Sequence, residues 1–463
     1  FKQKTAYEIM PSLVGSEMCI RDSLCDDLGY GDISCYGNKI IKTPNIDRLA
    51  SQGIRFTDYY SPSPVCSPSR VGLLTGRTPN RAGIYDWIPS GTQFHLEEKE
   101  FTIPKMLKRA GYATCMSGKW HCNGKFNKKS QPQPGDFGFD HWFATQNNAA
   151  PSHRNPKNFV RNGEGVGELE GFSCRIVAEE ANRWIENHVI ENPDQPFFTF
   201  IAFHEPHEPI SSPESMISNY PNAQKKGEAL YYANVENMDF AVGMIMDCLN
   251  RNKVAENTLV IFTSDNGPET LNRYGGAWRS HGSPGDLRGM KLHTHEAGIR
   301  VPGVMRWPLQ IKAGQVSDEP VNSLDLMPTF ANLAAGEIPI DIQLDGTDIV
   351  NAFGKDEVIR KRPMFWCYYS ALNKSKVALR DGNWKLLASL KSKNDKYLKI
   401  RSLNKSNYDL VKTAKLVDFE LYNIGNDNDE SLNLVDKNHD EFKRLSEAMR
   451  MMFDEVLKDS KIW

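Results

Sequence analysis

Apolar runs of strand length constrain the fold most strongly, because polar residues capable of chemistry follow each of them directly. Such runs cover residues 112–116, 197–203 and 259–263. Longer segments at residues 173–188 and 231–249 are plausible helices. Strands that alternate with helices favour a parallel sheet covered by helices, and open sheets of this kind bind ligands at the carboxyl ends of their strands. We therefore predict an α/β fold, with a large mixed, mostly parallel sheet flanked by helices.

The chain changes character after residue 361. The last part contains four runs of strand length and one polar helix, at residues 364–369, 375–380, 384–390, 419–422 and 440–457. The dipeptide Asp381-Gly382 suits a hairpin turn between two of these runs. We expect a catalytic domain at residues 24–361 and a small antiparallel sheet plus helix at residues 362–463. The Lys- and Asn-rich stretch 391–415 is predicted to be a solvated loop.

Composition excludes several classes of protein. The 463 residues carry a formal net charge of −2, which gives no reason to expect a nucleic acid or an anionic membrane surface as partner. No apolar run approaches the ~20 residues of a membrane span. The nine cysteines show neither CxxC pairs nor zinc-ligand spacing, so neither a disulfide framework nor a zinc module is indicated.

The first 23 residues differ from the rest of the chain. Glu8, Glu17 and Arg21 interrupt their apolar residues, so the segment lacks the apolar core of a secretory signal. We expect residues 1–23 to be a non-native leader that replaces the native signal and the first strand. The functional interpretation therefore starts at Leu24.

Two acidic clusters predict a metal site. Asp26-Asp27 lies where the first strand would end, and Asp265-Asn266 follows the run at 259–263. An Asp-Asp pair by itself is more often a solvated turn. Together the clusters supply three carboxylates and an amide, and such hard oxygen ligands suit Ca²⁺ or Mg²⁺. Ca²⁺ fits better if an anionic substrate completes the coordination, whereas zinc would prefer histidine or thiolate.

Cys66 stands between prolines in the stretch SPSPVCSPSRVGLLTGR, residues 61–77. The prolines exclude a regular central strand, and Pro68 suits the first turn of a helix. Cys66 would then lie at the N-terminus of that helix, where negative charge is favoured. Most cysteines are small core residues, but this position favours a reactive or anion-facing role.

Basic and titratable residues accumulate near the predicted metal site. They follow strand ends or lie in glycine-rich turns, and they are Arg70, Lys119, His121, His207 and Lys291. Each alone would be interpreted as a surface residue. Beside a predicted cation site, the set instead indicates a pocket for a tetrahedral oxyanion.

These motifs resemble those of type I, formylglycine-dependent sulfatases, which have the alkaline-phosphatase-like fold. Cys66-Ser67-Pro68-Ser69-Arg70 followed by Thr75-Gly76-Arg77 is similar to their signature C-x-P-S-R and T-G-R. The stretches DDLGYGD, SGKWH, PHEP and SDNG extend the resemblance along nearly the whole chain from Leu24. Departures are few: Cys25 replaces a common alanine, and Glu296-Ala297-Gly298 replaces Glu-Gly-Gly.

The resemblance implies the cofactors. Cys66 would be oxidised to formylglycine by a formylglycine-generating enzyme that reads Pro68 and Arg70 in the unfolded segment. One Ca²⁺ would be bound by Asp26, Asp27, Cys66, Asp265 and Asn266. A hydroxyl of the hydrated aldehyde would then attack the sulfur of a sulfate monoester and displace the alcohol.

The resemblance also implies a role for each remaining residue. Asp265 would help to take the attacking proton, and His207 with Lys291 would protonate or stabilise the leaving oxygen. His121 would take the proton of the second hydroxyl, which expels sulfate. Arg70 and Lys119 would hold the diol and the sulfate oxygens. His204 is the alternative acid, because it lies three residues before His207.

The substrate is expected to be a sulfated carbohydrate. Loop residues that could line the rim of the pocket are Trp87, His95, His153, Arg154, His204, Arg273 and His281. Such enzymes are usually exported, so a periplasmic or secreted location is expected.

Rival interpretations remain. A two-metal phosphatase would need His and Asp ligands with a Ser or Thr nucleophile, which this chain does not offer at these positions. A formylglycine-dependent phosphonate or phosphate ester hydrolase would differ only in its substrate. A non-catalytic binder of sulfated glycans would need only the basic pocket.

Overall fold

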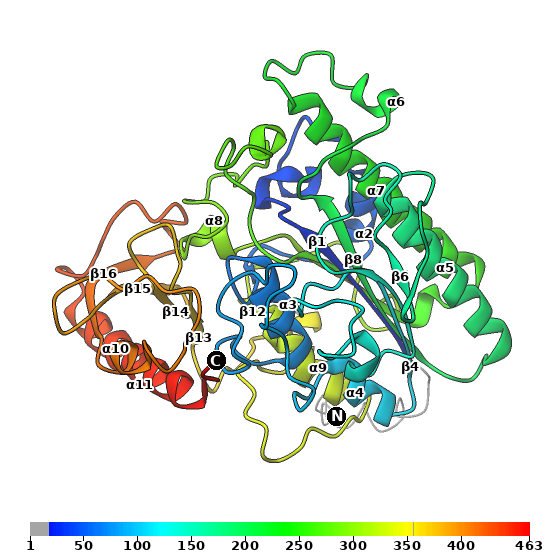
Figure 1. Ribbon diagram of the computed structural model, residues 1–463. Coiled ribbons are helices and arrows are strands. Elements are labelled where there is room, and N and C mark those ends of the chain that lie inside the picture. The colour runs from blue at the N-terminus through cyan, green and yellow to red at the C-terminus, as the bar shows by residue number, and fades with distance from the viewer. Residues whose placement is uncertain (1–17, 355) are drawn as a thin grey trace, which may run out of the picture.

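The computed structural model describes residues 18–354 and 356–463. A large twisted sheet forms its centre (Figure 1). In spatial order, its strands are β11 (Gln315–Ser317), β2 (Ile54–Phe56), β10 (Gly303–Arg306), β9 (Thr258–Ser264), β1 (Cys19–Asp26), β8 (Phe197–Pro206), β4 (Ala113–Lys119), β5 (His141–Thr145), β6 (Val160–Arg161) and β7 (Glu164–Gly165). The five strands from β9 to β5 are parallel, which confirms the predicted mixed, mostly parallel sheet.

The strand β1 lies at the middle of this sheet, between β9 and β8. Residues 19–23, which we expected to precede the catalytic domain, form its first half. Their burial explains this placement, since Cys19 and Ile20 pack into the cores on the two faces of the sheet. Residues 1–17 of the expected leader lie outside the described residues.

Helices cover both faces of the sheet (Figure 1). One core contains the apolar residues of α3 (Cys66–Thr75), α4 (Ile103–Arg109) and α9 (Leu326–Leu333), and the other contains those of α2 (Pro44–Ser51), α5 (Ser173–Glu191) and α7 (Glu228–Arg251). Alternate residues of one strand serve the two cores, because Phe198 and Phe200 of β8 face the first and Ile201 and Phe203 face the second. The continuous apolar runs of the sequence thus reflect strands that are buried on both sides.

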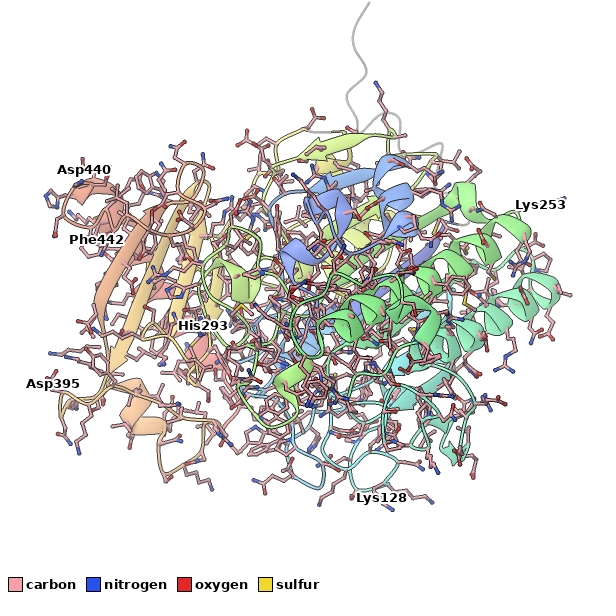
Figure 2. All side chains as sticks on the ribbon, turned by 90° about the horizontal axis from the view of Figure 1, so that it is seen from above. Lys128, Lys253, His293, Asp395, Asp440 and Phe442 are labelled. Carbon is pink, nitrogen blue, oxygen red and sulfur yellow. The ribbon has the colours of Figure 1, made fainter. Side chains whose placement is uncertain are left out.

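A second sheet lies beside the first, as Figure 2 shows from above. It is antiparallel and consists of β13 (Met364–Cys367), β14 (Val377–Asp381), β15 (Trp384–Lys391) and β16 (Lys415–Asn423), in that order. The helix α11 (His439–Asp459) packs its apolar side against this sheet through residues such as Leu445 and Met449. The remaining elements are β3 (Tyr59–Tyr60), α6 (Glu214–Ile217), α8 (Glu296–Ile299), β12 (Val321–Asn322) and α10 (Tyr408–Lys412).

The stretch 391–415 differs from the predicted solvated loop. Its apolar residues Leu398, Leu403 and Val411 are buried, and they pack into the core of the second sheet. The segment is irregular apart from α10, so its buried residues do not recur at the spacing of a helix or a strand. Among the many lysines and asparagines, their burial could not be recognised from the sequence.

Candidate active site

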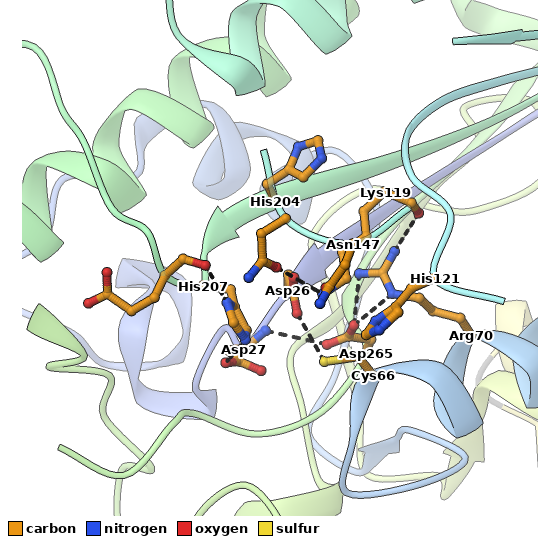
Figure 3. A network of polar contacts seen from close by, with 12 residues as sticks. Asp26, Asp27, Cys66, Arg70, Lys119, His121, Asn147, His204, His207 and Asp265 are labelled. Carbon is orange, nitrogen blue, oxygen red and sulfur yellow. Dashed lines mark hydrogen bonds and ion pairs between the residues drawn. The ribbon is translucent and has the colours of Figure 1, made fainter. Parts of the chain in front are cut away.

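The strands bring the candidate residues together at the carboxyl edge of the large sheet (Figure 3). β1 ends at Asp26, β4 ends at Lys119, and Asp265 follows β9. Cys66 is the first residue of α3, and its Sγ lies 3.4 Å from Oδ1 of Asp26. Parallel strands present their carboxyl ends on one side, so residues nearly 240 positions apart become neighbours, as with Asp27 and Asp265.

Four residues form a group that could hold a metal ion. Ligand atoms of Asp26, Asp27, Cys66 and His207 all lie within 4.8 Å of one another. Asn266 adjoins this group, because its Nδ2 donates to Oδ1 of Asp27 at 2.7 Å. The Oδ1 of Asn266 is buried and has no hydrogen-bond partner among the described residues. A buried acceptor of this kind is costly unless a cation or a donor satisfies it, so the residues fit a hard cation.

Asp265 and the two carboxylates of the group are each paired with a buried cation. The pairs and their N–O distances are Lys119–Asp26 at 2.5 Å, Lys291–Asp27 at 2.6 Å and Arg70–Asp265 at 2.8 Å. All six side chains are almost completely inaccessible to solvent. Charges buried at this density are stable only when they compensate one another, which makes the cluster a single electrostatic unit.

The carboxylates differ in their affinity for protons. Burial would raise the pKa of Asp26, but the charges of Lys119, His207, Arg70 and Lys291 together outweigh it and hold this pKa well below its usual range. At Asp27, burial raises the pKa to about 6 although Lys291 opposes it. Burial and the charge of Asp26 also raise the pKa of Asp265 to about 6. A cation bound among them would favour the ionised form of all three.

The thiol of Cys66 is held in its protonated form. Burial, followed by the charge of Asp26, raises its pKa well above the usual value. A thiolate is the reactive form of cysteine, so this environment works against an unmodified thiol as the nucleophile. The helix begins where the sequence predicts, with Pro68 in its first turn.

Two histidines at the site have tautomers set by backbone carbonyls. Nδ1 of His207 lies 2.6 Å from the carbonyl oxygen of Glu208, so Nδ1 carries the proton and Nε2 is left toward Asp27, 3.5 Å away. Nε2 of His121 donates to the oxygen of Ile88 at 3.2 Å, and its Nδ1 is a buried acceptor without a partner among the described residues. Burial lowers the pKa of both imidazoles, to about 4 at His207.

Three site residues have left-handed backbone conformations that non-glycine residues rarely adopt. The φ angles are 64° at Asp27, 53° at His121 and 69° at Leu292, which follows Lys291. Such conformations cost on the order of 1–3 kcal/mol each and persist where the surrounding structure enforces them. Because these conformations occur at Asp27, at His121 and directly after Lys291, the surrounding structure fixes the positions of these three site residues.

Several predicted rim residues lie elsewhere. His153 is fully buried, with Nδ1 3.1 Å from Nδ2 of Asn234, so it cannot line a rim. His204 is also fully buried, and its Nε2 contacts the hydroxyl of Thr145 at 2.7 Å. The strand β8 continues to Pro206 and so carries His204 into the interior; Figure 3 shows its ring turned away from Cys66.

Other rim candidates are accessible. His281 is half-buried and contacts the carbonyl of Lys226, and Arg154 is exposed. Arg273 joins the site indirectly, since it pairs with Glu269, whose Oε2 lies 4.0 Å from Nζ of Lys291.

The structure adds residues that the sequence did not indicate. Oδ1 of Asn148 accepts from Nζ of Lys119 at 3.4 Å, and Asn147 lies in the cluster of Figure 3. Oδ1 of Asn147 is buried without a partner among the described residues. The Asn-Asn pair follows β5, so its place after a strand was the available signal.

The fold and the site together define a class of enzyme. A tetrahedral oxyanion can be bound by the buried cations, and imidazoles beside it can move protons. On this sheet, that arrangement defines an ester hydrolase with the alkaline-phosphatase-like fold.

Comparisons with known proteins specify the family. The model of the sulfatase family matches residues 23–337, and that of the N-sulphoglucosamine sulphohydrolase C-terminal region matches residues 290–459. Human arylsulfatase A is 35% identical over 384 residues, 78% of this chain and 72% of that protein. N-acetylgalactosamine-6-sulfatase of Sus scrofa is 33% identical over 366 residues, 74% of this chain and 67% of that protein.

A solved structure is similar over nearly the whole chain. It is that of Ps i-CgsB in complex with k-i-k-neocarrahexaose, with a TM-score of 0.79, 28% identity and coverage of 96% and 94% of the two chains. The chain belongs to the sulfatase family and is a sulfuric ester hydrolase. Among the described residues, no helix combines the length and apolarity needed to cross a membrane.

Proposed function

We propose that this sulfatase hydrolyses a sulfate monoester of a sulfated carbohydrate, with formylglycine derived from Cys66 and one bound Ca²⁺. The observation that carries the proposal is the environment of Cys66. Its thiol is buried, protonated and surrounded by Asp26, Lys119 and Lys291, a setting that suits an oxygen nucleophile and an anionic substrate better than a thiolate.

The proposed Ca²⁺ ligands are Asp26, Asp27, Asp265 and Asn266, together with residue 66. Their donors are carboxylate and amide oxygens, which Ca²⁺ prefers, and the unpartnered Oδ1 of Asn266 supports the assignment. When bound, the ion would neutralise charge that develops on the sulfate oxygens.

The proposed aldehyde explains why a cysteine stands at the helix start. Its hydrate carries two hydroxyl groups on one carbon, one to attack sulfur and one to lose the proton that drives sulfate release. Lys119 and Arg70 would orient these oxygens from their ion pairs with Asp26 and Asp265.

The two histidines would act at different stages. His121 offers an unprotonated Nδ1 inside the cluster, which suits a base that accepts the proton of the second hydroxyl. His207 presents Nε2 beside Asp27 and near Lys291. To act as the acid, Nε2 would first take up a proton in the complex with the anionic substrate and then pass it to the leaving oxygen, with Lys291 stabilising the developing negative charge.

The substrate class rests on the relatives. N-acetylgalactosamine-6-sulfatase and a structure holding a neocarrahexaose both point to sulfated sugars. We also propose that the protein is exported from the cytoplasm and that a formylglycine-generating enzyme acts on it during maturation. We propose further that the chain is divided into a catalytic unit at residues 24–361 and a smaller unit at residues 362–463.

A direct test measures the mass of the tryptic peptide Phe56–Arg70 from protein coexpressed with a formylglycine-generating enzyme. We expect a peptide of aldehyde mass that a hydrazide traps, together with hydrolysis of 4-nitrocatechol sulfate. A peptide with only free thiol would overturn the proposed nucleophile. Faster hydrolysis of 4-nitrophenyl phosphate or a phosphonate ester would favour the rival hydrolase, and glycan binding without turnover by the aldehyde form would favour a binder.

A further inference from the structure

A separate cavity of about 170 Å³ lies at the junction of the two sheets. It is bounded by the segment that follows α3 and by the irregular stretch before α10; the lining residues are Gly83, Ile84, Tyr85, Asp86, Trp87, Ile88, Pro89, Phe94, Arg401 and Ser402. None of these residues belongs to the metal group or to the ion pairs at Cys66. The cavity therefore requires its own explanation.

One wall of the cavity is bonded directly to the reaction centre. The backbone N–H of Ile88 donates to the hydroxyl of Ser67, the residue after Cys66, at 3.0 Å. The carbonyl of Ile88 contacts Nε2 of His121 at 3.2 Å. One lining residue thus joins the segment of the nucleophile to the proposed base, so the cavity and the reaction centre share the hydrogen bonds of Ile88.

Tyr368 forms a second connection. Its ring packs in a small cluster with Val65 and Leu292, the neighbours of Cys66 and Lys291. Its hydroxyl donates to Oδ1 of Asp86 at 2.9 Å. Tyr368, which directly follows β13, thus contacts the chain neighbours of Cys66 and Lys291 and also the cavity wall.

The C-terminus holds the opposite wall in place. Nε1 of Trp463 donates to the carbonyl of Gly83 at 2.7 Å, and the hydroxyl of Tyr85 donates to the carbonyl of Lys461. The backbone of Trp463 also donates to Leu403, two residues after Arg401. Figure 1 shows the chain end returning to this junction. Both lining segments are therefore anchored.

The polar lining is chemically selective. The guanidinium of Arg401 is exposed and forms no ion pair or hydrogen bond within the described part of the chain. Trp87 keeps 42% of its surface exposed, and the half-buried Asp86 also lines the cavity, with Oδ1 already occupied. An exposed indole can pack on the apolar face of a sugar ring, a carboxylate can accept from its hydroxyls, and a free guanidinium can bind a sulfate or carboxylate in a bidentate manner.

We propose that this cavity is a subsite for the sugar adjacent to the reacting sulfate, and that it selects a sugar carrying a second anionic group. Arg401 binds that group, Trp87 packs against the ring and Asp86 accepts hydroxyl hydrogens. The inference rests on the proposed sulfatase function and adds a specificity to it: the substrate is an oligosaccharide with charges on neighbouring units. The volume of about 170 Å³ lies below the usual range of small-molecule pockets, so it can hold no more than one ring.

The test uses the aldehyde-bearing full-length enzyme with 4-nitrocatechol sulfate, sulfated monosaccharides, and disaccharides from chondroitin sulfate and carrageenan with and without a second anion. The readout is the ratio of kcat/KM on each doubly charged disaccharide to that on its matching monosaccharide. We expect Arg401→Ala to lower this ratio at least tenfold, mainly through KM, with Arg401→Lys intermediate. Trp87→Ala should lower it more than Trp87→Phe does.

The matched control is Lys399→Ala, which removes an exposed cation from the same stretch but outside the cavity lining. The ratio should stay at the parent value. A parent enzyme that cleaves the aryl sulfate but never favours a doubly charged disaccharide would overturn the subsite, as would an Arg401→Ala variant with an unchanged ratio. Failure of the parent on all sulfates, with the aldehyde present, would instead overturn the proposed function.

Discussion

Nζ of Lys291 lies 2.6 Å from Oδ1 and 2.8 Å from Oδ2 of Asp27, so a single ammonium contacts both oxygens of one buried carboxylate. Burial would lower the pKa of Lys291, but the negative charges around it, that of Asp27 first, together raise it well above the usual value. The lysine is therefore a permanent cation. It can stabilise a leaving oxygen electrostatically, whereas it is poorly suited to donate its own proton.

Removal of this cation should damage both activity and stability. Lys291→Ala is expected to lower kcat on an aryl sulfate about 100-fold or more, the effect typical of losing one preorganised donor. It should also lower the melting temperature, because a buried carboxylate loses its partner. Steady-state kinetics and calorimetry measure the two effects. Lys312→Ala, at an exposed lysine, is the control, and equal kinetics in both variants would contradict the role.

The choice of acid can be tested by comparing His207→Ala with His204→Ala on an aryl and an alkyl sulfate. An alkoxide is the more basic leaving group, so loss of the true acid should reduce alkyl sulfate hydrolysis more strongly, by about 10²-fold or more. We expect this pattern at His207, whose Nε2 faces the site, and not at His204, which is bonded to Thr145. The reverse pattern would reassign the acid.

The metal site predicts a selective thermal shift. CaCl₂ should raise the melting temperature of the parent protein. At a Ca²⁺ concentration of 100 times the dissociation constant, the free energy of unfolding should rise by about 2.7 kcal/mol. Asn266→Ala should reduce this shift, because it removes a buried oxygen ligand. Differential scanning fluorimetry with CaCl₂, MgCl₂ and EGTA measures it. Asn250→Ala, at an exposed position of α7, should respond as the parent does.

The strand β1 carries an adjacent buried pair, Arg21 and Asp22, and both carboxylate oxygens of Asp22 lack a partner among the described residues. Burial raises the pKa of Asp22 to about 7 from 3.8. In the unfolded chain Asp22 ionises near its usual pKa, so the free energy of unfolding should fall as the pH rises from about 4 to about 7. The total loss of stability is roughly 4 kcal/mol, at about 1.4 kcal/mol per pKa unit.

Asp22→Asn should remove that pH dependence and stabilise the protein above pH 7. Urea unfolding at pH 5 and pH 8 compares the variants, with the exposed Asp454→Asn as control. If the difference in unfolding free energy between the parent and Asp22→Asn is the same at pH 5 and pH 8, the buried charge of Asp22 is not the cause.

A buried ion triad joins the second sheet to α8. Nζ of Lys385 on β15 lies 2.7 Å from Glu296 and 2.9 Å from Glu430. Lys385→Met leaves both carboxylates without their shared cation, which should cost about 3–5 kcal/mol. Urea unfolding measures the loss. Lys393→Met changes an exposed lysine nearby and should stay within about 0.5 kcal/mol of the parent.

Residues at strand ends were predictable from the sequence, because an apolar run followed by polar residues marks both the strand and its exit. Lys119 and Asp265 lie at strand ends as predicted on this basis, whereas Asp26 was expected at the end of a strand that we took to be missing and lies at the end of β1. The orientation of a side chain after a strand was not predictable, which is why His153 was expected at a rim and lies in the interior. Only the packing of neighbouring segments decides that direction.

Of the cavity residues that we propose to bind sugar, Trp87 was among the candidate rim residues of the sequence, whereas Arg401 could not have been found in the same way. Arg401 lies in an irregular segment without period, and its position depends on buried contacts of Leu398 and Leu403. Tyr368 contacts the site across the boundary between the two sheets, so no local sequence pattern indicates this contact.

The complete burial of α3 has a consequence for biosynthesis. Every residue of this helix is buried, and Cys66 keeps only 2% of its surface exposed, so no modifying enzyme could reach the thiol in the folded protein. Asp265, which pairs with Arg70 of this helix, is translated about 200 residues after Cys66. At about 5–20 residues per second, the ribosome leaves the segment uncovered for on the order of 10–40 s. Conversion of Cys66 would have to be completed in that interval, and translation speed would then set the fraction of active enzyme.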